Sequence, residues 1–539
     1  MVLEHERLAE RAHNQHVKME SIKPRRGAIY DNRMRELAVN RKVESLYGVP
    51  REIGDPALVA RKLSPYVRMS DRTLVKRLSL DKSFVWLERK LEDSAVQRIK
   101  RLNLSPQVGF VPETRRTYPK GSLGAHVIGF VNMDNKGSEG LELKYDEILR
   151  GRSRQRQHGM DAHGRALSNG GLYSGSTMGD SLVLTLDEDL QYIVEKELFN
   201  AVKKWKASSA VSILMEPDTG RILAMAVSPT FSPERPDKPE HWRNRAVTDV
   251  YEPGSTFKSI LAAAALEESV ARPSDRFDCS KGYIEVGGRK IRDDHRHKVL
   301  SFAEVIQKSS NVGAVKIAQR LGKNRFYGYI RSFGFGAKTG SDLPGEVRGL
   351  LRAPERWSGS SIGALAVGYE VAVTPLQLLN AYCAIANGGV LMRPYIVSEI
   401  IDADGRTVRS FSPKPIRRVI SKKTSAILTG ILEKVVQEGG TAVRASVLGN
   451  PVAGKTGTAR KLNSNGRYSR TRYVSSFVGF VPSDKPRLAI IVVVDEPKGA
   501  IYGGEVAAPV FRNIAEHALI YLNVPRENNG NILLVSDER

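Results

Sequence analysis

Ser255 and Lys258 form the first pair in the chain whose types and spacing suit chemistry, within Ser255-Thr256-Phe257-Lys258. The residues that follow are rich in alanine and leucine, which predicts a helix beginning at Ser255. Positions i and i+3 share one face of a helix, so the hydroxyl and the amine can meet. A serine hydroxyl is a weak nucleophile at neutral pH, but a desolvated lysine beside it can accept its proton. The pair is therefore a candidate nucleophile with its base.

This spacing alone is weak evidence, because a serine three residues before a lysine is common on helices. The alternative is a serine that caps a helix and a lysine that points into solvent. With Gly254 in front, the same stretch loosely resembles a phosphate-binding loop, but Phe257 stands where that loop needs a glycine. Nucleotide binding is therefore not expected, and further motifs must decide between the other two interpretations.

A second motif, Ser309-Ser310-Asn311, lies between the amphipathic segment Phe302–Gln307 and the helical pattern of Val312–Leu321. We expect it to form a short turn between helices. A serine in that turn can relay a proton between the lysine of the first motif and an amine, and the asparagine carboxamide can hold a substrate amide. The alternative is an ordinary helix cap.

A third motif, Lys455-Thr456-Gly457-Thr458, lies at the end of an apolar strand. Glycine lets a substrate backbone lie close to the strand edge, and the lysine and threonines supply donors for a carboxylate. The backbone N–H groups of Ser255 and Thr458 can form an oxyanion hole, which stabilises a tetrahedral intermediate. Together the three motifs predict acyl transfer through a serine.

In this order, the motifs resemble the S-x-x-K, S-D-N and K-T-G signature of penicillin-binding proteins and class A β-lactamases, with Ser-Ser-Asn as the middle triplet. Further segments resemble class B penicillin-binding proteins of the cell-division, or FtsI, type. These segments are Arg26–Asp31, Arg116–Pro119, Ala125-His126, Gly140–Glu142, Leu184–Asp187, Gly479–Glu496, Tyr502–Gly504 and Ala508–Phe511. One departure is Gly368-Tyr369-Glu370, because members of the family often carry a second glycine there, in a Gly-x-Gly turn.

The resemblance implies a peptidoglycan D,D-transpeptidase that cross-links stem peptides in septal wall synthesis through a serine acyl-enzyme and is covalently inhibited by β-lactams. It implies no cofactor and no metal. The residues that it implies for catalysis are Ser255, Lys258 and Ser309, and those for substrate binding are Asn311, Lys455, Thr456, Gly457 and Thr458. Two alternatives stay open: a D,D-carboxypeptidase or β-lactamase, which sends the acyl-enzyme to water, and a non-catalytic divisome scaffold or β-lactam sensor.

The length of 539 residues predicts two or three domains. Up to about Asp180 the chain is charged, broken by turns and free of catalytic motifs, whereas from Ser181 a strand runs into Asp187, a candidate helix cap. Strands at both ends of the later part, around a helical middle, predict an α+β fold with an antiparallel sheet flanked by helices. We expect a non-catalytic pedestal over 1–180, the penicillin-binding (serine-acyltransferase) domain over 181–525 and a C-terminal tail over 526–539. The resemblance implies that the pedestal is an elongated, mixed α/β domain of the dimerisation or interaction type.

Several local elements follow from short patterns. Alternation predicts strands in the pedestal, and turn residues between apolar runs predict a hairpin early in the catalytic domain. The third motif should be followed by a polar loop that lasts through Thr471. The segments concerned are strands at Val108–Val111, Ala125–Val131, Ala210–Leu214, Arg221–Val227, Ser476–Val481 and Leu488–Val494, and a final helix at Pro509–Leu522.

The formal net charge of +24 indicates an anionic neighbour, such as acidic lipid or an acidic wall polymer. The basic residues are spread along the chain, and the densest stretch, 75–101, interleaves acidic residues at helical spacing, so we expect a solvated amphipathic face and not a nucleic-acid surface. The resemblance implies D-Ala-D-Ala stem peptides, β-lactams, an FtsW-type glycosyltransferase and other divisome proteins as partners. It also implies an anchor helix upstream of Met1 in the bacterial cytoplasmic membrane, with the catalytic domain on the extracytoplasmic side.

Two tempting features are interpreted as structural. Residues Asp293–His297 (DDHRH) resemble a metal cluster, but adjacent ligands alternate poorly around one ion, so we expect a structural loop. Cys279 and Cys383 lie outside any metal-binding spacing and are expected to be ordinary, partly buried thiols.

Overall fold

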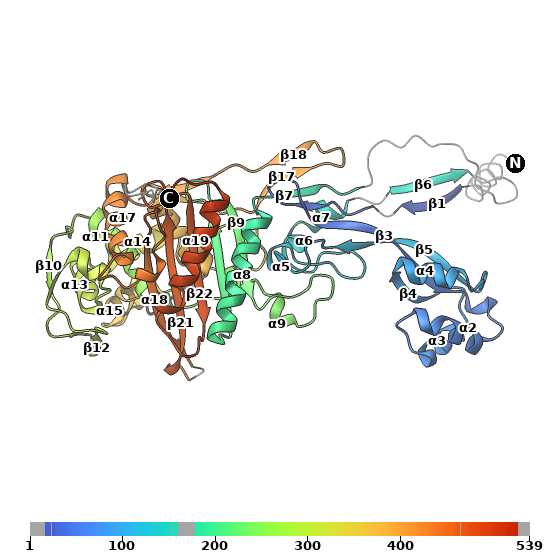
Figure 1. Ribbon diagram of the computed structural model, residues 1–539, viewed down its shortest axis with the longest axis horizontal. Helices are drawn as coiled ribbons and strands as arrows, with labels where there is room; N and C mark the ends of the chain where they lie inside the picture. Colours follow the sequence, from blue (N-terminus) through green and yellow to red (C-terminus); the bar gives the residue numbers. More distant parts are fainter. Residues whose placement is uncertain (1–16, 23, 152–153, 160–177, 464, 527–539) are drawn as a thin grey trace, which may run out of the picture.

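The computed structural model describes residues 17–22, 24–151, 154–159, 178–463 and 465–526. The molecule is elongated: a broad block of helices and sheet narrows into an extension that ends in a small lobe (Figure 1). One large hydrophobic core fills the block and continues into the adjoining part of the extension, and a second core fills the small lobe. The expected α+β fold is confirmed.

A five-stranded antiparallel sheet forms the centre of the block, in the order β20-β21-β22-β8-β9. Its strands are β8 Ser209–Met215, β9 Ile222–Ser228, β20 Ala453–Leu462, β21 Tyr468–Val481 and β22 Leu488–Asp495. Every residue of β8 and β9 is buried, as expected for strands covered on both faces. Helices α8 (Glu188–Trp205) and α19 (Ala508–Tyr521) pack together on one face (Figure 1), and α16 (Pro375–Ala386) packs against β8, β21 and β22.

A group of helices covers the far end of this sheet around α11, which runs over Lys258–Glu267. Its residues from Lys258 to Leu266 are all buried, as in a helix that is surrounded on every side. The helices around it are α12 Phe302–Gln307, α13 Asn311–Leu321, α14 Lys323–Ser332, α15 Ser361–Ala366 and α17 Lys422–Val436. The short strand pairs beside them are β10 Arg276–Asp278 with β13 Val299–Ser301, β11 Tyr283–Val286 with β12 Arg289–Arg292, β14 Leu350–Leu351 with β15 Val371–Ala372, and β16 Val390–Met392 with β19 Pro415–Arg418.

The extension is built on a second sheet, in the order β18-β17-β7-β2-β3-β4, with β5 also paired to β3. Its strands are β2 Ile29–Tyr30, β3 Glu36–Gly48, β4 Val85–Leu91, β5 Val108–Thr117, β7 Ser181–Leu184, β17 Val397–Ile401 and β18 Thr407–Ser410. A separate pair joins β1 Val17–Ile22 to β6 Arg154–Gly159, and the lobe adds α2 Pro56–Leu63, α3 Asp71–Leu78 and α4 Asp93–Lys100. Since β7 pairs with both β2 and β17, segments distant in sequence share this sheet.

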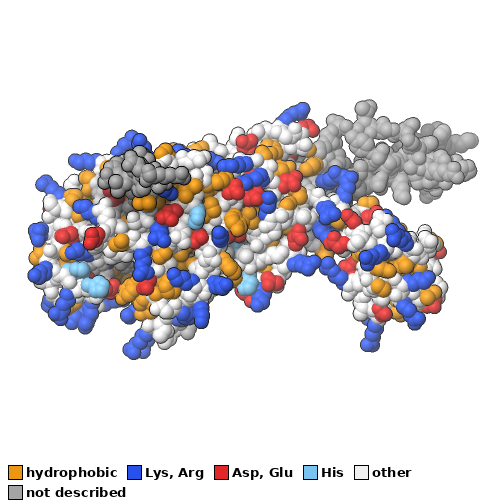
Figure 2. Space-filling view, viewed as in Figure 1, with side chains coloured by type: hydrophobic (Ala, Val, Ile, Leu, Met, Phe, Trp, Pro, Cys, Tyr) orange, Lys and Arg blue, Asp and Glu red, His pale blue; other side chains and the backbone are white. Residues whose placement is uncertain are grey.

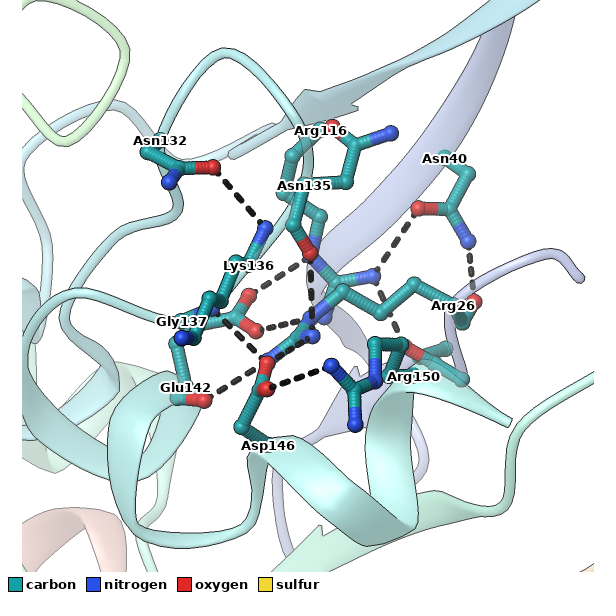
Figure 3. Close-up of polar contacts among 12 residues, drawn as sticks. Arg26, Asn40, Arg116, Asn132, Asn135, Lys136, Gly137, Glu142, Asp146 and Arg150 are labelled. Atoms are coloured by element: carbon teal, nitrogen blue, oxygen red, sulfur yellow. Dashed lines mark hydrogen bonds and ion pairs between the residues drawn. The ribbon is translucent and has the colours of Figure 1, made fainter. Parts of the chain in front are cut away.

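A buried ionic cluster holds the middle of the extension together (Figure 3). Glu142, on α6 (Gly140–Lys144), accepts from Arg26 Nε at 2.5 Å and from Arg116 Nε at 2.6 Å, and Arg26 also pairs with Asp146 at 2.6 Å. Both arginines and Glu142 are at most 2% exposed. Three of the segments that carry the family resemblance thus converge on one carboxylate.

A second ionic cluster joins this extension to the block. Arg35 pairs with Asp31 and with Asp189, each at 2.7 Å, and Tyr521 donates to Asp187 at 2.8 Å and to Asp189 at 2.9 Å. Asp187 is also the N-cap of α8, as the sequence predicted. The turn before β3, the start of α8 and the end of α19 therefore meet at one point.

Several local predictions differ from the structure. Part of the expected strand Ala125–Val131 is a one-turn helix, α5 Ala125–Ile128, bracketed by Gly124 and Gly129 at φ +67° and +77°. Glycine enters this left-handed region freely, so the chain can turn at both ends of the helix. The apolar run is too short for its periodicity to distinguish a helix from a strand. The stretch 75–101, whose charges have helical spacing, contains the end of α3 and most of α4. Strand β4 lies between these two helices, and its Val85 and Leu87 are buried.

The polar stretch after the third motif is mostly strand and not loop, because β20 continues to Leu462 and β21 begins at Tyr468. Lys461 of this ribbon pairs with Asp495 and with Glu496, each at 2.8 Å. These ion pairs reach from β20 across β21 to the end of β22, and in this polar ribbon hydrophobic alternation gives no signal for a strand. The hairpin of β8 and β9 and the final helix were predicted correctly.

On the face shown in Figure 2, Lys and Arg side chains are spread along the described part of the molecule, with acidic side chains interspersed. No helix in the described part of the chain is long and apolar enough to cross a lipid bilayer. Among the same residues, no group of His, Cys, Asp and Glu is arranged to hold a metal ion. Cys279 and Cys383 are both unpaired and fully buried, more deeply than expected.

Candidate active site

The three motifs meet around Lys258 and Ser309, between the central sheet and the helices around α11. Lys258 Nζ lies 3.1 Å from Ser255 Oγ, 3.2 Å from Ser309 Oγ and 2.7 Å from Asn311 Oδ1. Lys455 Nζ lies 3.0 Å from the same Ser309 Oγ. Residues far apart in sequence therefore surround one small polar centre.

The first motif begins as a 3-10 turn over Gly254–Phe257 and becomes α11 at Lys258, one turn later than a helix beginning at Ser255. Tyr382 of α16 fixes this turn: its hydroxyl donates to the Thr256 carbonyl at 2.8 Å and lies 2.7 Å from Ser259 Oγ. Because Tyr382 is fully buried, the position of the turn is set by the core.

Both motif lysines are fully buried. Burial lowers the pKa of Lys258 to about 8, against the smaller opposing effect of Asp293 and Asp294. Burial also lowers the pKa of Lys455 well below its usual value, and the charge of Lys258 lowers it further. Their closest partners are hydroxyls, carbonyls and a carboxamide, so a substantial fraction of Lys258 is neutral near pH 8 and can take a proton from Ser255.

The second motif is the expected turn between α12 and α13, and Ser309 in it has φ +60°. A non-glycine residue in this left-handed region costs about 1 kcal/mol or more, so its surroundings must hold it there. The carbonyl of Ser309 accepts from Lys258 Nζ at 2.6 Å. The unusual conformation places both the carbonyl and the hydroxyl of one residue against the lysine.

Asp293 anchors this turn from outside the motif. Its carboxylate accepts from Ser310 Oγ at 2.9 Å, from the Asn311 backbone N–H and from the Val312 backbone N–H at 3.0 Å. A carboxylate at the N-terminal end of a helix satisfies free N–H groups and is favoured by the helix dipole. The acidic and histidine-rich stretch thus contributes a helix cap beside the site.

The third motif lies on β20, directly against the first. A Cβ on Gly457 would lie 2.8 Å from the Pro253 carbonyl, and one on Gly254 would lie 3.1 Å from the Thr458 carbonyl, so the two backbones are in contact. Thr456 Oγ1 lies 2.9 Å from Thr441 Oγ1, and Thr458 Oγ1 accepts from the Gly503 N–H at 3.1 Å. All eight predicted site residues are brought to this region, and the oxyanion hole of Ser255 and Thr458 stays a prediction.

The departure at Gly368-Tyr369-Glu370 has a structural counterpart. Glu370 has φ +61°, the conformation that a glycine would adopt most easily at this position. A Cβ on Gly368 would lie 2.0 Å from the Gly254 carbonyl, so this loop packs tightly on the residue before Ser255.

Comparisons with known proteins agree with this geometry. Residues 210–516 match the penicillin binding protein transpeptidase domain, and residues 21–184 match the penicillin-binding protein dimerisation domain. The chain is a class B penicillin-binding protein of the FtsI type.

Relatives and solved structures of this family resemble the protein over nearly its full length. It is 39% identical to stage V sporulation protein D of Bacillus subtilis over 94% of this chain and 80% of that protein. It is 33% identical to the peptidoglycan D,D-transpeptidase FtsI of Escherichia coli, over 94% and 85%. The crystal structure of penicillin-binding protein 3 from Mycobacterium tuberculosis with aztreonam has a TM-score of 0.73 at 29% identity, over 94% and 98%.

Three residues of this penicillin-binding protein's site were not found from the sequence: Asp293, Tyr382 and Glu370. Asp293 was interpreted only as part of a structural loop, and its spacing from the second motif carries no general signal. In the sequence, Tyr382 cannot be distinguished from the apolar residues around it in a buried helix. Glu370 was noticed as a departure from the family, but its left-handed conformation and its partners needed the structure.

Proposed function

We propose that Ser255 is the nucleophile of this peptidoglycan D,D-transpeptidase and that Lys258 removes its proton. The observation that carries the proposal is the contact of 3.1 Å between Lys258 Nζ and Ser255 Oγ, together with full burial of the lysine. A buried amine with a lowered pKa is a base at neutral pH, and the shared helical turn holds it at hydrogen-bonding distance.

The other site residues have roles that follow from their contacts. Ser255 attacks the carbonyl of the penultimate D-Ala of a stem peptide, and terminal D-Ala leaves with a proton passed from Lys258 through Ser309, which touches both lysines. An amine of a neighbouring stem then attacks the acyl-enzyme and completes the cross-link. Asn311, Lys455, Thr456, Gly457 and Thr458 bind the peptide and its carboxylate.

A β-lactam enters the same path, because its strained amide stands in for the scissile peptide bond. The opened ring stays attached to Ser255 and blocks the acceptor amine. The expected product is a stable adduct, as opposed to the rapid turnover of a β-lactamase.

Labelling with a fluorescent penicillin tests the nucleophile. The wild type should be labelled stoichiometrically, Ser255→Ala should not be labelled, and Ser446→Ala, at an exposed serine of the same domain, should be labelled like the wild type. Labelling of Ser255→Ala at the wild-type rate would overturn the assignment. Release of the label within seconds would favour the β-lactamase alternative, and persistence over many minutes would exclude it.

We also propose the biological setting in septal wall synthesis. The division into a pedestal over 1–180, a catalytic domain over 181–525 and a tail over 526–539, of which 527–539 lie outside the described residues, agrees with the two family matches. The pedestal contacts an FtsW-type glycosyltransferase and other divisome proteins, and an anchor holds the protein in the cytoplasmic membrane with the catalytic domain outside. Support comes from the similarity to FtsI and from the net charge of +24, which suits an anionic surface.

Co-sedimentation with anionic vesicles tests the membrane contact of the chain itself. Binding at low salt that disappears at high salt is expected for an electrostatic contact. No binding at low salt would contradict the attraction. Co-purification of the anchored protein with the glycosyltransferase, and its loss on deletion of the lobe formed by α2, α3 and α4, tests the pedestal's role.

A further inference from the structure

A group of charged side chains lies beside the segment that enters Ser255. Glu252, three residues before the nucleophile, accepts with Oε1 from the Tyr468 hydroxyl at 3.0 Å and from the Glu370 backbone N–H at 2.8 Å. Its other oxygen, Oε2, is buried and has no hydrogen-bond partner among the described residues. Such an oxygen is costly unless a donor reaches it.

Glu370, whose backbone N–H donates to Glu252, holds two arginines with its own side chain. Its carboxylate accepts from Arg352 and from Ser361 Oγ, each at 2.7 Å, and lies 3.7 Å from Arg289. The side chains of Arg352 and Arg289 remain 47% and 42% exposed. A guanidinium has five N–H donors, so each arginine keeps donors for a further anion.

We call this cluster of Glu252, Arg289, Arg352 and Glu370 the rim, because it borders the segments that carry the predicted catalytic residues. The Gly254 N–H donates to the Gly368 carbonyl at 3.1 Å, which ties the loop of Glu370 to the nucleophile's neighbour. On the other side, Arg289 belongs to β12, whose Arg292 carbonyl accepts from Asn311 Nδ2 at 2.7 Å. The cluster therefore connects the segments that carry the nucleophile and the asparagine of the second motif.

Glu370 stands in a conformation that costs free energy for a side chain, where glycine would be free of strain. Its three side-chain partners come from β12, from the loop before α15 and from the start of α15. A carboxylate kept at such a position orders two exposed guanidinium groups that would otherwise be flexible.

We infer that this rim is a subsite for a side chain of the stem peptide that ends in both an ammonium and a carboxylate. Glu252 receives the ammonium, and Arg289 and Arg352 receive the carboxylate. The substrate class is a stem whose diamino acid is a dicarboxylic one, such as diaminopimelate, in preference to lysine or to an amidated side chain. This inference rests on the proposed function, because it extends the substrate of the same nucleophile.

The charges support this choice of ligand. Two carboxylates and two guanidinium groups balance one another, so a zwitterion adds no net charge, whereas a lone ammonium leaves the remaining guanidinium donors of Arg289 and Arg352 without a second anion. Burial raises the pKa of Glu252, partly opposed by its hydrogen bonds from the Glu370 N–H and the Tyr468 hydroxyl and, less, by the charge of Arg289. An ammonium that binds Oε2 would also favour the ionised carboxylate. Recognition of both ends is worth about tenfold or more in rate, the usual scale for charge-assisted hydrogen bonds.

The test uses penicillins that differ only at the end of the acyl side chain. One ends in an α-amino carboxylate, one in the corresponding amide, and benzylpenicillin has no charged terminus. Second-order rate constants for acylation of Ser255 are measured for the wild type, Arg289→Gln, Arg352→Gln and Arg512→Gln. Arg512 is a matched control, because it is 45% exposed and pairs with a glutamate on α19.

The wild type and Arg512→Gln should react about tenfold faster with the zwitterionic penicillin than with its amide, and either rim variant should lose most of this preference. Benzylpenicillin is the reference for each protein: the ratio of the zwitterion's rate constant to that of benzylpenicillin should fall in both rim variants and stay at the wild-type value in Arg512→Gln. Equal rates for the zwitterion and the amide in the wild type, or an unchanged preference in both rim variants, would overturn the inference. Absence of acylation by all three compounds would instead refute the proposed function.

Discussion

The pedestal and the catalytic cleft both bury cations, but they surround them with different partners. In the pedestal, Arg26 and Arg116 are paired with carboxylates at 2.5–2.6 Å. In the cleft, Lys258 and Lys455 contact hydroxyls, carbonyls and a carboxamide. The first arrangement keeps the cations charged and fixes three chain segments, whereas the second destabilises the charged form and leaves an amine able to move a proton.

The difference shows which buried cations are structural and which are chemical. Paired arginines cannot release a proton in the physiological range, so the pedestal cluster contributes only through geometry and packing. A buried lysine without a carboxylate partner lowers the stability of the fold. Because two such lysines lie where the three motifs meet, their presence there indicates a function. Loss of Lys258 should therefore reduce activity without reducing stability, and loss of the Glu142 charge should reduce stability without reducing activity.

The largest effect is expected from Lys258→Met, which removes the amine and keeps a similar length. Acylation by penicillin should fall by about 10⁴-fold, because the base and the proton relay are lost together. The melting temperature should stay the same or rise, since a poorly solvated amine is replaced by an apolar side chain. A marked loss of stability with near-normal acylation would reverse the comparison.

The pedestal should show the opposite pattern in Glu142→Gln. Removing the charge shared by Arg26 and Arg116 leaves two buried guanidinium groups poorly paired and should lower the free energy of unfolding by about 3–5 kcal/mol. Penicillin acylation by the protein that remains folded should be unchanged. Denaturant unfolding measures the loss, and Glu516→Gln, which breaks an exposed pair on α19, should cost less than about 1 kcal/mol.

The acylation rate should depend on pH through Lys258. Its pKa is lowered to about 8, so the neutral base is the minor form below pH 8 and the major form above it. The rate constant should therefore rise about tenfold per pH unit below 8 and level off above it. Asp293 raises this pKa, so Asp293→Asn should move the midpoint to lower pH, and a midpoint moving upward would contradict the assigned cause.

The smallest effect concerns Glu370 at the rim. Glu370→Ala loses the contacts with Arg352 and Ser361 but keeps the left-handed strain at φ +61°. Glu370→Gly loses the same contacts and relieves the strain, so it should be more stable than the alanine variant by about 1 kcal/mol. Equal stabilities in denaturant unfolding would show that the loop relaxes without strain.

The sequence predicted which residues meet in the cleft better than it predicted the groups that hold them, and the catalytic roles of these residues stay predictions. Ser255, Lys258, Ser309, Asn311 and Lys455 could be identified because their order and types match a known signature, and the structure places them together. The groups that hold them, such as Asp293 and Tyr382, act through tertiary contacts that leave no pattern in the chain. The same holds for Glu142, whose role depends on two arginines distant in sequence.

Secondary structure followed the same division. The apolar strands β8, β9 and β22 and helix α19 were predicted because burial on the sheet imposes a clear pattern. The helical turn of α5 and the polar ribbon of β20 and β21 were missed. In the first, glycine conformation decides the backbone, and in the second, polar and charged residues form the strands, so neither has hydrophobic periodicity. The sequence also could not predict that β17, which lies far beyond the pedestal in the chain, belongs to the sheet of the extension.

Direct titration of Lys258 tests the central claim that the cleft holds a neutral amine beside Ser255. The lysine ε-carbons are labelled with carbon-13, and the resonance of Lys258 is assigned by its absence in Lys258→Met. The account predicts that this resonance titrates with a midpoint near pH 8. A midpoint near the ordinary lysine value, about 10.4, would contradict it.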